Sequence, residues 1–425
     1  MPARIPATMP ARIPAAMPGF SQRIGRVQLA ASVQMTIKAR ELRAAGKPVI
    51  TLTTGEPNFD SPPHAIEAAH QAALHGDTKY PPQDGTRALK EAIQRKFKRD
   101  SGLDYALDEI SVSNGGKQGL FNAIMATVDP DDEVVLPVPC WVAYAQMTQL
   151  CEGVPVFVNC PQNNGFKPRA EDIDAAITPR TKWVILNNPN NPTGACCSAA
   201  EIAAIAAVMR KHPHVWILSD DMYEHLVFDG FQHATFAQVA PDLIDRTLTV
   251  SGVSKTYAMT GWRIGFAGGP KPLIRAMTVM QGHATAGVST VGQAAAAAAL
   301  DGPQDGVEQE IEAYKRRRDL AVDMLNAAKG ISCHKPEGAF YVFPNVAGCL
   351  GKTTTGGRQL LTDEDVCMAL LEDHYVATVH GAAYFMSPFL RISTATADDE
   401  LIEGLRRIQT FCEGLREDAD QHTRG

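Results

Sequence analysis

One stretch of the chain, Ser251–Gly265 (SGVSKTYAMTGWRIG), combines a lysine that can act as a nucleophile with an arginine that can bind an anion. Apolar segments on either side, LTVSG and RIGFAGG, read as short buried strands, so Lys255 lies on the connection between them. An amine held in a partly dry site can form a Schiff base with a carbonyl compound. Arg263 would then be a fixed cation for a phosphate on the same ligand. The alternative is a lysine that pairs with an acid or extends to solvent, and this stretch alone leaves both interpretations open.

Short apolar strands alternate with helical segments through the middle of the chain: EVVLPV, WVILN, VWILS, TLTVS and IGFAGG. This alternation predicts an α/β fold, with a mainly parallel sheet covered by helices on both faces. Ligands of such sheets bind at the carboxyl ends of the strands, where the loops meet. Residues able to contact a ligand follow the predicted strands in order: Gly115–Lys117, Trp141, Asn191, Asp220, Tyr223, Lys255 and Arg263.

The segment Gly115, Gly116 and Lys117 opens a predicted helix. Free backbone N–H groups and the positive end of the helix dipole would face one point there, which suits an anion. A plain tight turn is the alternative. We expect this segment and the other residues at strand ends to converge on one pocket.

Composition excludes several classes of protein. The chain has 425 residues and a net charge of −7, which gives no basic surface for nucleic acid or an anionic membrane. No apolar run approaches the roughly 20 residues that span a bilayer. Nine cysteines, an odd number without zinc spacing, indicate reduced thiols and a cytoplasmic protein. The length is sufficient for two domains.

The chain begins with a proline-rich repeat, MPARIPAT followed by MPARIPAA. Proline at every fourth position excludes the amphipathic helix of a transit peptide, so we expect residues 1–19 to be a disordered extension, with Met9 or Met17 as alternative starts. The remaining pattern predicts a large domain, 65–329. A smaller α+β domain would combine 330–425 with an N-terminal arm, 20–64.

Nine motifs occur along the chain in this order: GEPNF, TKYPPQDG, NGGKQ, CWVAY, NPNNPTG, SDDMYEH, SKTYAMTGWRIG, PEGAFYVFP and FLRIS. With them the chain, from about Phe20 to Leu415, resembles the fold-type I, pyridoxal-phosphate-dependent aminotransferases of class I/II, the aspartate/aromatic aminotransferase family. The resemblance implies a seven-stranded-type, mainly parallel sheet and a smaller α+β domain. It also implies the cofactor pyridoxal 5′-phosphate and ping-pong transamination between an L-amino acid (aromatic, neutral or aspartate) and a 2-oxo acid.

The resemblance also implies a role for each matching residue. Lys255 would hold the cofactor aldehyde and later move the substrate proton, while Asp220 would keep the pyridine nitrogen protonated. Tyr223 and Asn191 would bond the ring hydroxyl, and Trp141 would stack on the ring. Trp141 and Asn191 would also contact the substrate.

For the phosphate, the resemblance implies the set Gly115, Gly116, Lys117, Ser251 or Ser254, Arg263 and Tyr80. In this family the tyrosine comes from the neighbouring subunit, so a homodimer with shared active sites is expected. Arg391, in FLRIS, would hold the substrate α-carboxylate with two parallel hydrogen bonds, and the backbone of Gly55 would line the same pocket.

The chain departs from the family pattern at three places. Gly252 stands where a serine or threonine is usual, which leaves open whether Ser251 or Ser254 meets the phosphate. Met125 and Gln28 stand where members that prefer acidic substrates tend to carry lysines. A missing cation would leave a side-chain carboxylate unpaired, so we expect neutral or aromatic substrates to be used at least as well as aspartate.

Three other functions are compatible with parts of the pattern. A lyase that performs β-elimination would use the same site. A transcription regulator on this fold would need a DNA-binding domain, and the segment before Phe20 is too short and proline-rich for one. An inactive binding protein is disfavoured by the presence of Lys255, Asp220 and Arg391.

Overall fold

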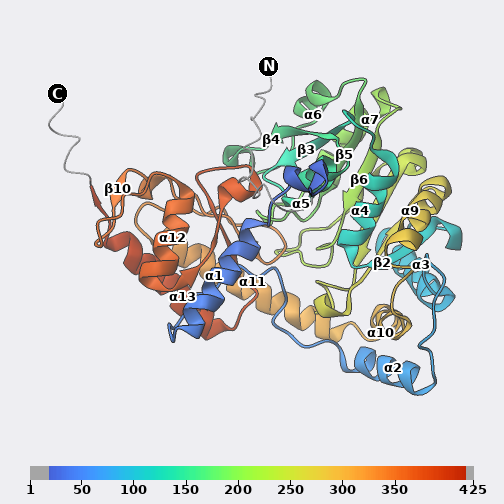
Figure 1. The fold of residues 1–425 in the computed structure, drawn as a ribbon, viewed down its shortest axis with the longest axis horizontal. Helices are drawn as coiled ribbons and strands as arrows, with labels where there is room; N and C mark the ends of the chain where they lie inside the picture. Colours follow the sequence, from blue (N-terminus) through green and yellow to red (C-terminus); the bar gives the residue numbers. More distant parts are fainter. Residues whose placement is uncertain (1–18, 418–425) are drawn as a thin grey trace.

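The computed structural model describes residues 19–417, so nearly all of the predicted extension at 1–19 lies outside the described part of the chain. A central sheet covered by helices forms one side of the molecule, and the C-terminal helices with short strands form the other (Figure 1). The long helix α11 (Asp305–Asn326) runs from one side to the other. Among residues 19–417, no helix has the length and apolar character needed to cross a membrane.

The central sheet has seven strands in the order β2-β8-β7-β6-β5-β3-β4. Every neighbouring pair is parallel except those of β8, which runs antiparallel to both β2 and β7. The sheet confirms the predicted α/β class. Its strands are β2 Ile110–Asn114, β3 Glu133–Val138, β4 Val154–Asn159, β5 Thr181–Asn187, β6 Trp216–Asp220, β7 Thr247–Gly252 and β8 Ile264–Gly268.

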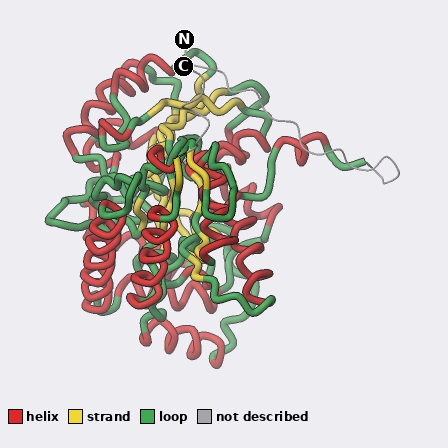
Figure 2. Tube along the Cα trace, turned by 90° about the vertical axis from the view of Figure 1, so that its left-hand side faces the viewer, coloured by secondary structure: helices red, strands yellow, loops and turns green. Residues whose placement is uncertain are grey.

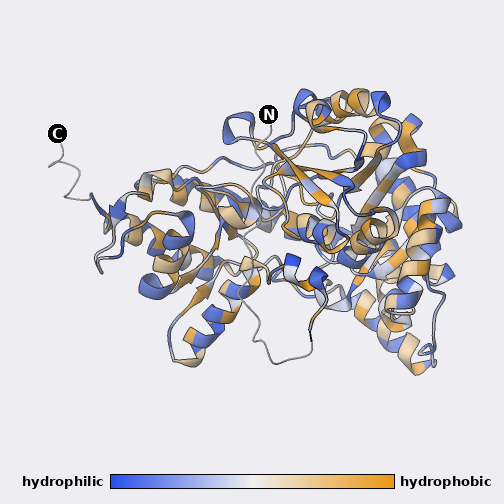
Figure 3. Cartoon of the chain, turned by 45° about the horizontal axis from the view of Figure 1, so that its top comes forward, coloured by the Kyte–Doolittle hydropathy of each residue, from blue (hydrophilic) through white to orange (hydrophobic). Residues whose placement is uncertain are grey.

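Helices lie on both sides of these strands (Figure 2), which explains why the strands are almost continuously apolar (Figure 3). In α10, Ala295, Ala296 and Ala299 are fully buried, and their small side chains allow close packing on α2 and α3. The helices of this side are α2 Pro63–Leu74, α3 Arg87–Ser101, α4 Gly116–Thr127, α5 Ala143–Leu150, α6 Ala170–Ala176, α7 Ala199–Lys211, α8 Phe236–Val239, α9 Lys271–Ala284 and α10 Thr290–Asp301.

The second side joins both ends of the described chain around one apolar cluster. Strand β1 pairs in parallel with β11, and Leu52 packs in the same cluster as Leu370 and Leu405. On this packing we propose that 20–64 and 330–425 form a small domain beside a large domain, 65–329. The elements of this side are α1 Ala31–Ala44, β1 Ile50–Thr51, β9 Tyr341–Val342, β10 Lys352–Thr353, α12 Asp363–His374, β11 Val376–Ala377, β12 Val379–His380, β13 Leu390–Ser393, α13 Asp398–Glu413 and β14 Arg416–Glu417.

Candidate active site

One cavity of about 730 Å³ lies where the carboxyl ends of the parallel strands meet. Because β8 runs in the opposite direction, its first residues lie at this same edge, and Arg263 directly precedes it. The volume is typical of a cofactor or substrate site. The predicted residues that line the cavity are Gly55, Gly116, Lys117, Trp141, Asn191, Asp220, Tyr223, Ser254, Lys255, Arg263 and Arg391.

Three predicted residues do not line this cavity. Gly115 instead leaves room for Arg263, since a Cβ atom at this position would lie 2.2 Å from Nη2 of that arginine. Ser251 is buried and donates a hydrogen bond to Glu224 Oε1 at 2.6 Å, which favours Ser254 as the serine that faces a ligand. Tyr80 is 94% exposed and lies outside the cavity of its own chain.

Lys255 lies on the connection from β7 to β8, as the sequence predicts. Its Nζ donates a hydrogen bond to the carbonyl oxygen of Gly55 at 2.5 Å. Burial lowers the pKa of Lys255 to about 8; the carboxylate of Glu56 opposes this shift, and the charges of Arg391 and Arg263 add to it. The amine is therefore closer to its neutral, nucleophilic form at neutral pH than an exposed lysine.

Asp220, at the end of β6, is a buried carboxylate. Its Oδ2 accepts a hydrogen bond from the hydroxyl of Tyr144 at 2.6 Å, and its Oδ1 accepts one from the backbone N–H of Met222 at 3.2 Å. Burial raises the pKa of Asp220 to about 6, although these two hydrogen bonds lower it. The sequence reasoning missed Tyr144, which is the last residue of the CWVAY motif.

Two cations at the start of α4 have no acidic partner within residues 19–417. Arg263 donates to the backbone carbonyls of Thr260 at 2.8 Å and Asn114 at 3.2 Å. Lys117 Nζ lies 4.8 Å from the centre of the Trp141 ring, and burial together with the charge of Arg263 lowers the pKa of Lys117. Two neighbouring cations at a helix N-terminus form a site for an anion such as a phosphate.

Arg391, on β13, presents an incompletely bonded guanidinium to the cavity. It is 4% exposed and lies 4.7 and 5.2 Å from the ring centres of Tyr341 and Tyr384. Nη2 donates to the carbonyl of Thr53 at 2.5 Å and Nη1 to Oδ1 of Asn191 at 3.1 Å, whereas the buried Nε has no partner among the described residues. A buried cation with a free donor suits a carboxylate ligand.

Two neutral hydrogen-bonding groups complete the cavity wall. The hydroxyl groups of Tyr223 and Tyr341 lie 2.9 Å apart. Burial and the neighbouring tyrosine raise the pKa of Tyr223 well above its ordinary value, so the hydroxyl stays protonated and able to donate. A Cβ atom at Gly55 would lie 2.5 Å from the Tyr341 hydroxyl oxygen, which explains the glycine at that position.

The structure does not support the specificity argument from Met125 and Gln28, because neither residue lines the cavity. Met125 packs against Cys151, with Sδ and Sγ 3.4 Å apart. It lies eight residues after Lys117 on α4, about 12 Å along the helix. Two arginines that the sequence reasoning missed, Arg40 and Arg43 on α1, do line the cavity.

Residues 47–408 of the chain match the family of class I and II aminotransferases. The chain therefore belongs to this family, whose members use pyridoxal phosphate, and it is an aminotransferase that acts on an amino acid and a 2-oxo acid. Family membership supports transamination over the β-elimination considered from the sequence.

Individual relatives align with this chain over nearly their whole length. The chain is 52% identical to an aspartate aminotransferase of Rhizobium meliloti over 395 residues, 93% of this chain and 96% of the relative. It is 53% identical to an aspartate/prephenate aminotransferase of Cereibacter sphaeroides, covering 93% of this chain and 99% of the relative. The crystal structure of an aspartate aminotransferase from Rhizobium meliloti superposes with a TM-score of 0.91, at 52% identity, covering 94% of this chain and all of that one. The Thermus thermophilus enzyme with maleate superposes with a TM-score of 0.87, at 39% identity, covering 93% of this chain and all of that one.

Proposed function

We propose that this chain binds pyridoxal 5′-phosphate in the 730 Å³ cavity and transfers the amino group of L-aspartate to a 2-oxo acid. The observation that carries the proposal is the combination of groups in this one cavity. They are an amine with a lowered pKa, a buried carboxylate, and, counting partners among the described residues, two cations without an acidic partner and a buried guanidinium with a free donor.

The residues fit each part of the cofactor. Arg263, Lys117, the N–H groups that open α4 and the hydroxyl of Ser254 would hold the phosphate. Asp220 would face the ring nitrogen, because a buried carboxylate gains most from a cationic partner. Once bound, pyridoxal phosphate supplies an aldehyde that condenses with amines and a ring that delocalises the electron pair left when the Cα–H bond breaks.

The chain contributes binding, orientation and proton transfer. Lys255, whose pKa burial lowers to about 8, would in its neutral form take the proton from the substrate Cα and return it at the next step. Arg391 would fix the α-carboxylate through its planar fork, which also sets the direction of the Cα–H bond. Tyr223 and Asn191 would donate hydrogen bonds to the ring hydroxyl, and Trp141 would cover one face of the ring.

The preference for aspartate rests on two observations. The relatives are named as aspartate or aspartate/prephenate aminotransferases, and the Thermus structure contains maleate, a dicarboxylate. The cavity also offers cations beyond Arg391, namely Arg40 and Arg43, so the absence of lysines at Met125 and Gln28 does not exclude an acidic side chain.

We also propose that the chain works as a homodimer with shared sites. Tyr80 does not line the cavity of its own chain, and it is nearly fully exposed. Large apolar side chains are exposed on the N-terminal segment and on α2, including Phe20, Ile24, Leu29 and Leu74. Exposed apolar side chains of this size are typical of a surface covered by a second copy.

The test is spectroscopic and kinetic. Purified protein should bind pyridoxal phosphate with an absorbance band that L-aspartate removes, with release of the oxo acid and without ammonia. Lys255→Ala should still bind the cofactor but lose turnover by more than the roughly 10⁴-fold of a lost proton-transfer group. Near-native transamination by Lys255→Ala would refute the assignment, and a kcat/KM for phenylalanine above that for aspartate would refute the substrate preference.

A further inference from the structure

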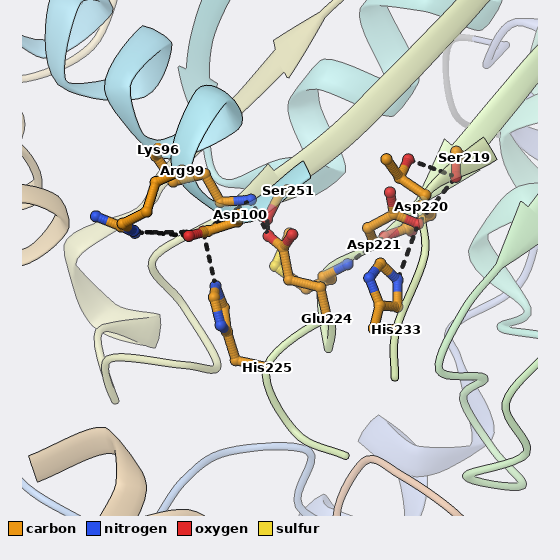
Figure 4. A network of polar contacts seen from close by, with 12 residues as sticks. Lys96, Arg99, Asp100, Ser219, Asp220, Asp221, Glu224, His225, His233 and Ser251 are labelled. Carbon is orange, nitrogen blue, oxygen red and sulfur yellow. Dashed lines mark hydrogen bonds and ion pairs between the residues drawn. The ribbon is translucent and has the colours of Figure 1, made fainter. Parts of the chain in front are cut away.

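A second carboxylate, Asp221, lies directly behind Asp220 in a buried polar network (Figure 4). It is only 1% exposed. Its Oδ1 accepts a hydrogen bond from the hydroxyl of Ser219 at 2.9 Å, while its Oδ2 has no partner among residues 19–417. A buried anion with so few donors is costly unless a cation compensates it.

The described part of the chain offers Asp221 one cation within ion-pair distance, the imidazole of His233. Its Nε2 lies 3.7 Å from Asp221 Oδ1 and 3.1 Å from the carbonyl oxygen of Asn188. Because a carbonyl oxygen only accepts, Nε2 carries a hydrogen in either charge state. Burial lowers the pKa of His233, but Asp221 and then Glu224 raise it, and the net shift is upward.

The other charges nearby are already paired. Glu224 accepts hydrogen bonds from Lys96 Nζ at 2.5 Å and from the Ser251 hydroxyl at 2.6 Å. Lys96 also lies 3.6 Å from Asp100, so it is shared by two other carboxylates. Figure 4 shows these groups beside the pair of Asp221 and His233.

The charge of Asp221 matters because of its neighbour. Asp220 is surrounded by the hydroxyl of Tyr144, the amine of Lys255 and the carboxylate of Asp221, and only the last disfavours its ionised form electrostatically. Two adjacent carboxylates without a counter-ion cannot both stay ionised easily, since each raises the proton affinity of the other.

We propose that His233 is a positioning residue that carries a positive charge and neutralises Asp221, so that Asp220 can stay ionised beside a positively charged ring nitrogen. The part of this inference that concerns the ring nitrogen rests on the proposed function. The charge state of His233 does not, because it is a property of the protein without cofactor.

The first measurement follows histidine titration in the cofactor-free protein. Histidine labelled with ¹³C in the ring gives one resonance for each residue, and the His233 resonance is identified by its loss in His233→Gln. We expect its midpoint to lie above the ordinary value of about 6.5. A midpoint at or below that value overturns the proposal, whether or not the protein binds pyridoxal phosphate.

The second measurement is the affinity for pyridoxal phosphate as a function of pH. His233→Gln leaves Asp221 uncompensated, so the midpoint of tight binding should move up by about one pH unit, a tenfold change in proton affinity. The double variant His233→Gln/Asp221→Asn removes both charges and should return the midpoint to the wild-type value. A purely structural role of His233 would not be rescued in this way.

His212 provides a matched control, since its Nε2 lies 2.7 Å from Oδ1 of Asp174, a carboxylate outside the cavity. His212→Gln should leave the binding profile unchanged. If His233→Gln does not fold, Asp221→Asn still decides, because it removes the anion that holds the proton on His233 and should lower the titration midpoint of one histidine resonance. Histidine midpoints that all stay unchanged in Asp221→Asn overturn the proposal. Failure of wild-type protein to bind the cofactor at any pH would instead refute the proposed function, while the histidine titration would still stand.

Discussion

The hydroxyl of Tyr144 provides the sharpest single test of the electrostatics at Asp220. Its hydrogen bond to the buried carboxylate is short, 2.6 Å, and charge-assisted. Such a bond is worth about 1.5–3 kcal/mol, which corresponds to about one to two pKa units. Because the bond favours the ionised form, Tyr144→Phe should raise the pKa of Asp220 from about 6 to roughly 7–8.

The change in pKa predicts the size of the functional effect. At pH 7 the ionised fraction of Asp220 in the cofactor-free protein would fall from about 0.9 to about 0.1–0.5. If tight binding requires the ionised form, affinity for pyridoxal phosphate falls about two- to tenfold at pH 7. At pH 9 nearly all of the carboxylate is ionised in both proteins, so the difference should largely disappear.

The assay is equilibrium binding of pyridoxal phosphate to wild type and variant between pH 5.5 and about 9, a range that brackets the titration of a group near pH 6–8. Tyr105→Phe is the matched control, because the Tyr105 hydroxyl is also buried but lies 3.2 Å from Thr249 Oγ1, away from the cavity. A loss of affinity that is equal at every pH would show that Tyr144 acts through packing. Coincident wild-type and Tyr144→Phe profiles would refute the reasoning altogether.

Three further predictions follow from the same geometry. Arg391→Lys keeps the charge but loses the planar fork, so kcat/KM for aspartate should fall about tenfold or more, and an unchanged value contradicts its role. A mixture of Tyr80→Ala and Lys255→Ala proteins under subunit exchange should regain about a quarter of native sites, and no recovery counts against shared sites. Because the pKa of Asp220 is raised in the folded protein, its contribution to the stability of the cofactor-free protein decreases as pH rises from about 4 to about 6. Asp220→Asn should therefore stabilise that form at pH 7, by up to about 3 kcal/mol in chemical denaturation, while it abolishes turnover.

The sheet was predictable from the sequence because its strands are buried on both faces and therefore read as apolar runs. The direction of β8 was not part of that prediction, although a signal exists. Only 11 residues separate Gly252 from Ile264, and none form an α-helix, whereas a parallel crossover needs a dozen or more residues and usually a helix. The short connection that carries Lys255 therefore makes β8 antiparallel. That direction places Arg263, which directly precedes β8, at the same cavity as Lys255.

The sequence predicted the site residues that directly follow strands. It did not reveal the residues that reach the cavity only through tertiary packing. Arg40 reaches the cavity only because α1 packs with the C-terminal strands, a contact between distant segments that no local pattern reveals. Met125 shares α4 with Lys117, but two helical turns carry it away from the end of the helix that faces the cavity. Tyr144 lies in the quoted CWVAY motif, yet nothing in its spacing shows that its hydroxyl meets Asp220.

The charges around β6 show why such a site costs stability in the absence of its ligand. Asp220 and Asp221 are both buried, and within residues 19–417 the only donors to the first are Tyr144 and the backbone N–H of Met222. On the other side of the cavity are Lys255, Lys117 and the free Nε of Arg391, and none of them has a carboxylate partner in the described part of the chain. Each uncompensated group disfavours the folded protein, and a ligand that is anionic at one end and cationic at a ring would relieve both sets at once. Binding of the cofactor should thus stabilise this fold by more than its contact area suggests, because it neutralises charges that the chain has already buried.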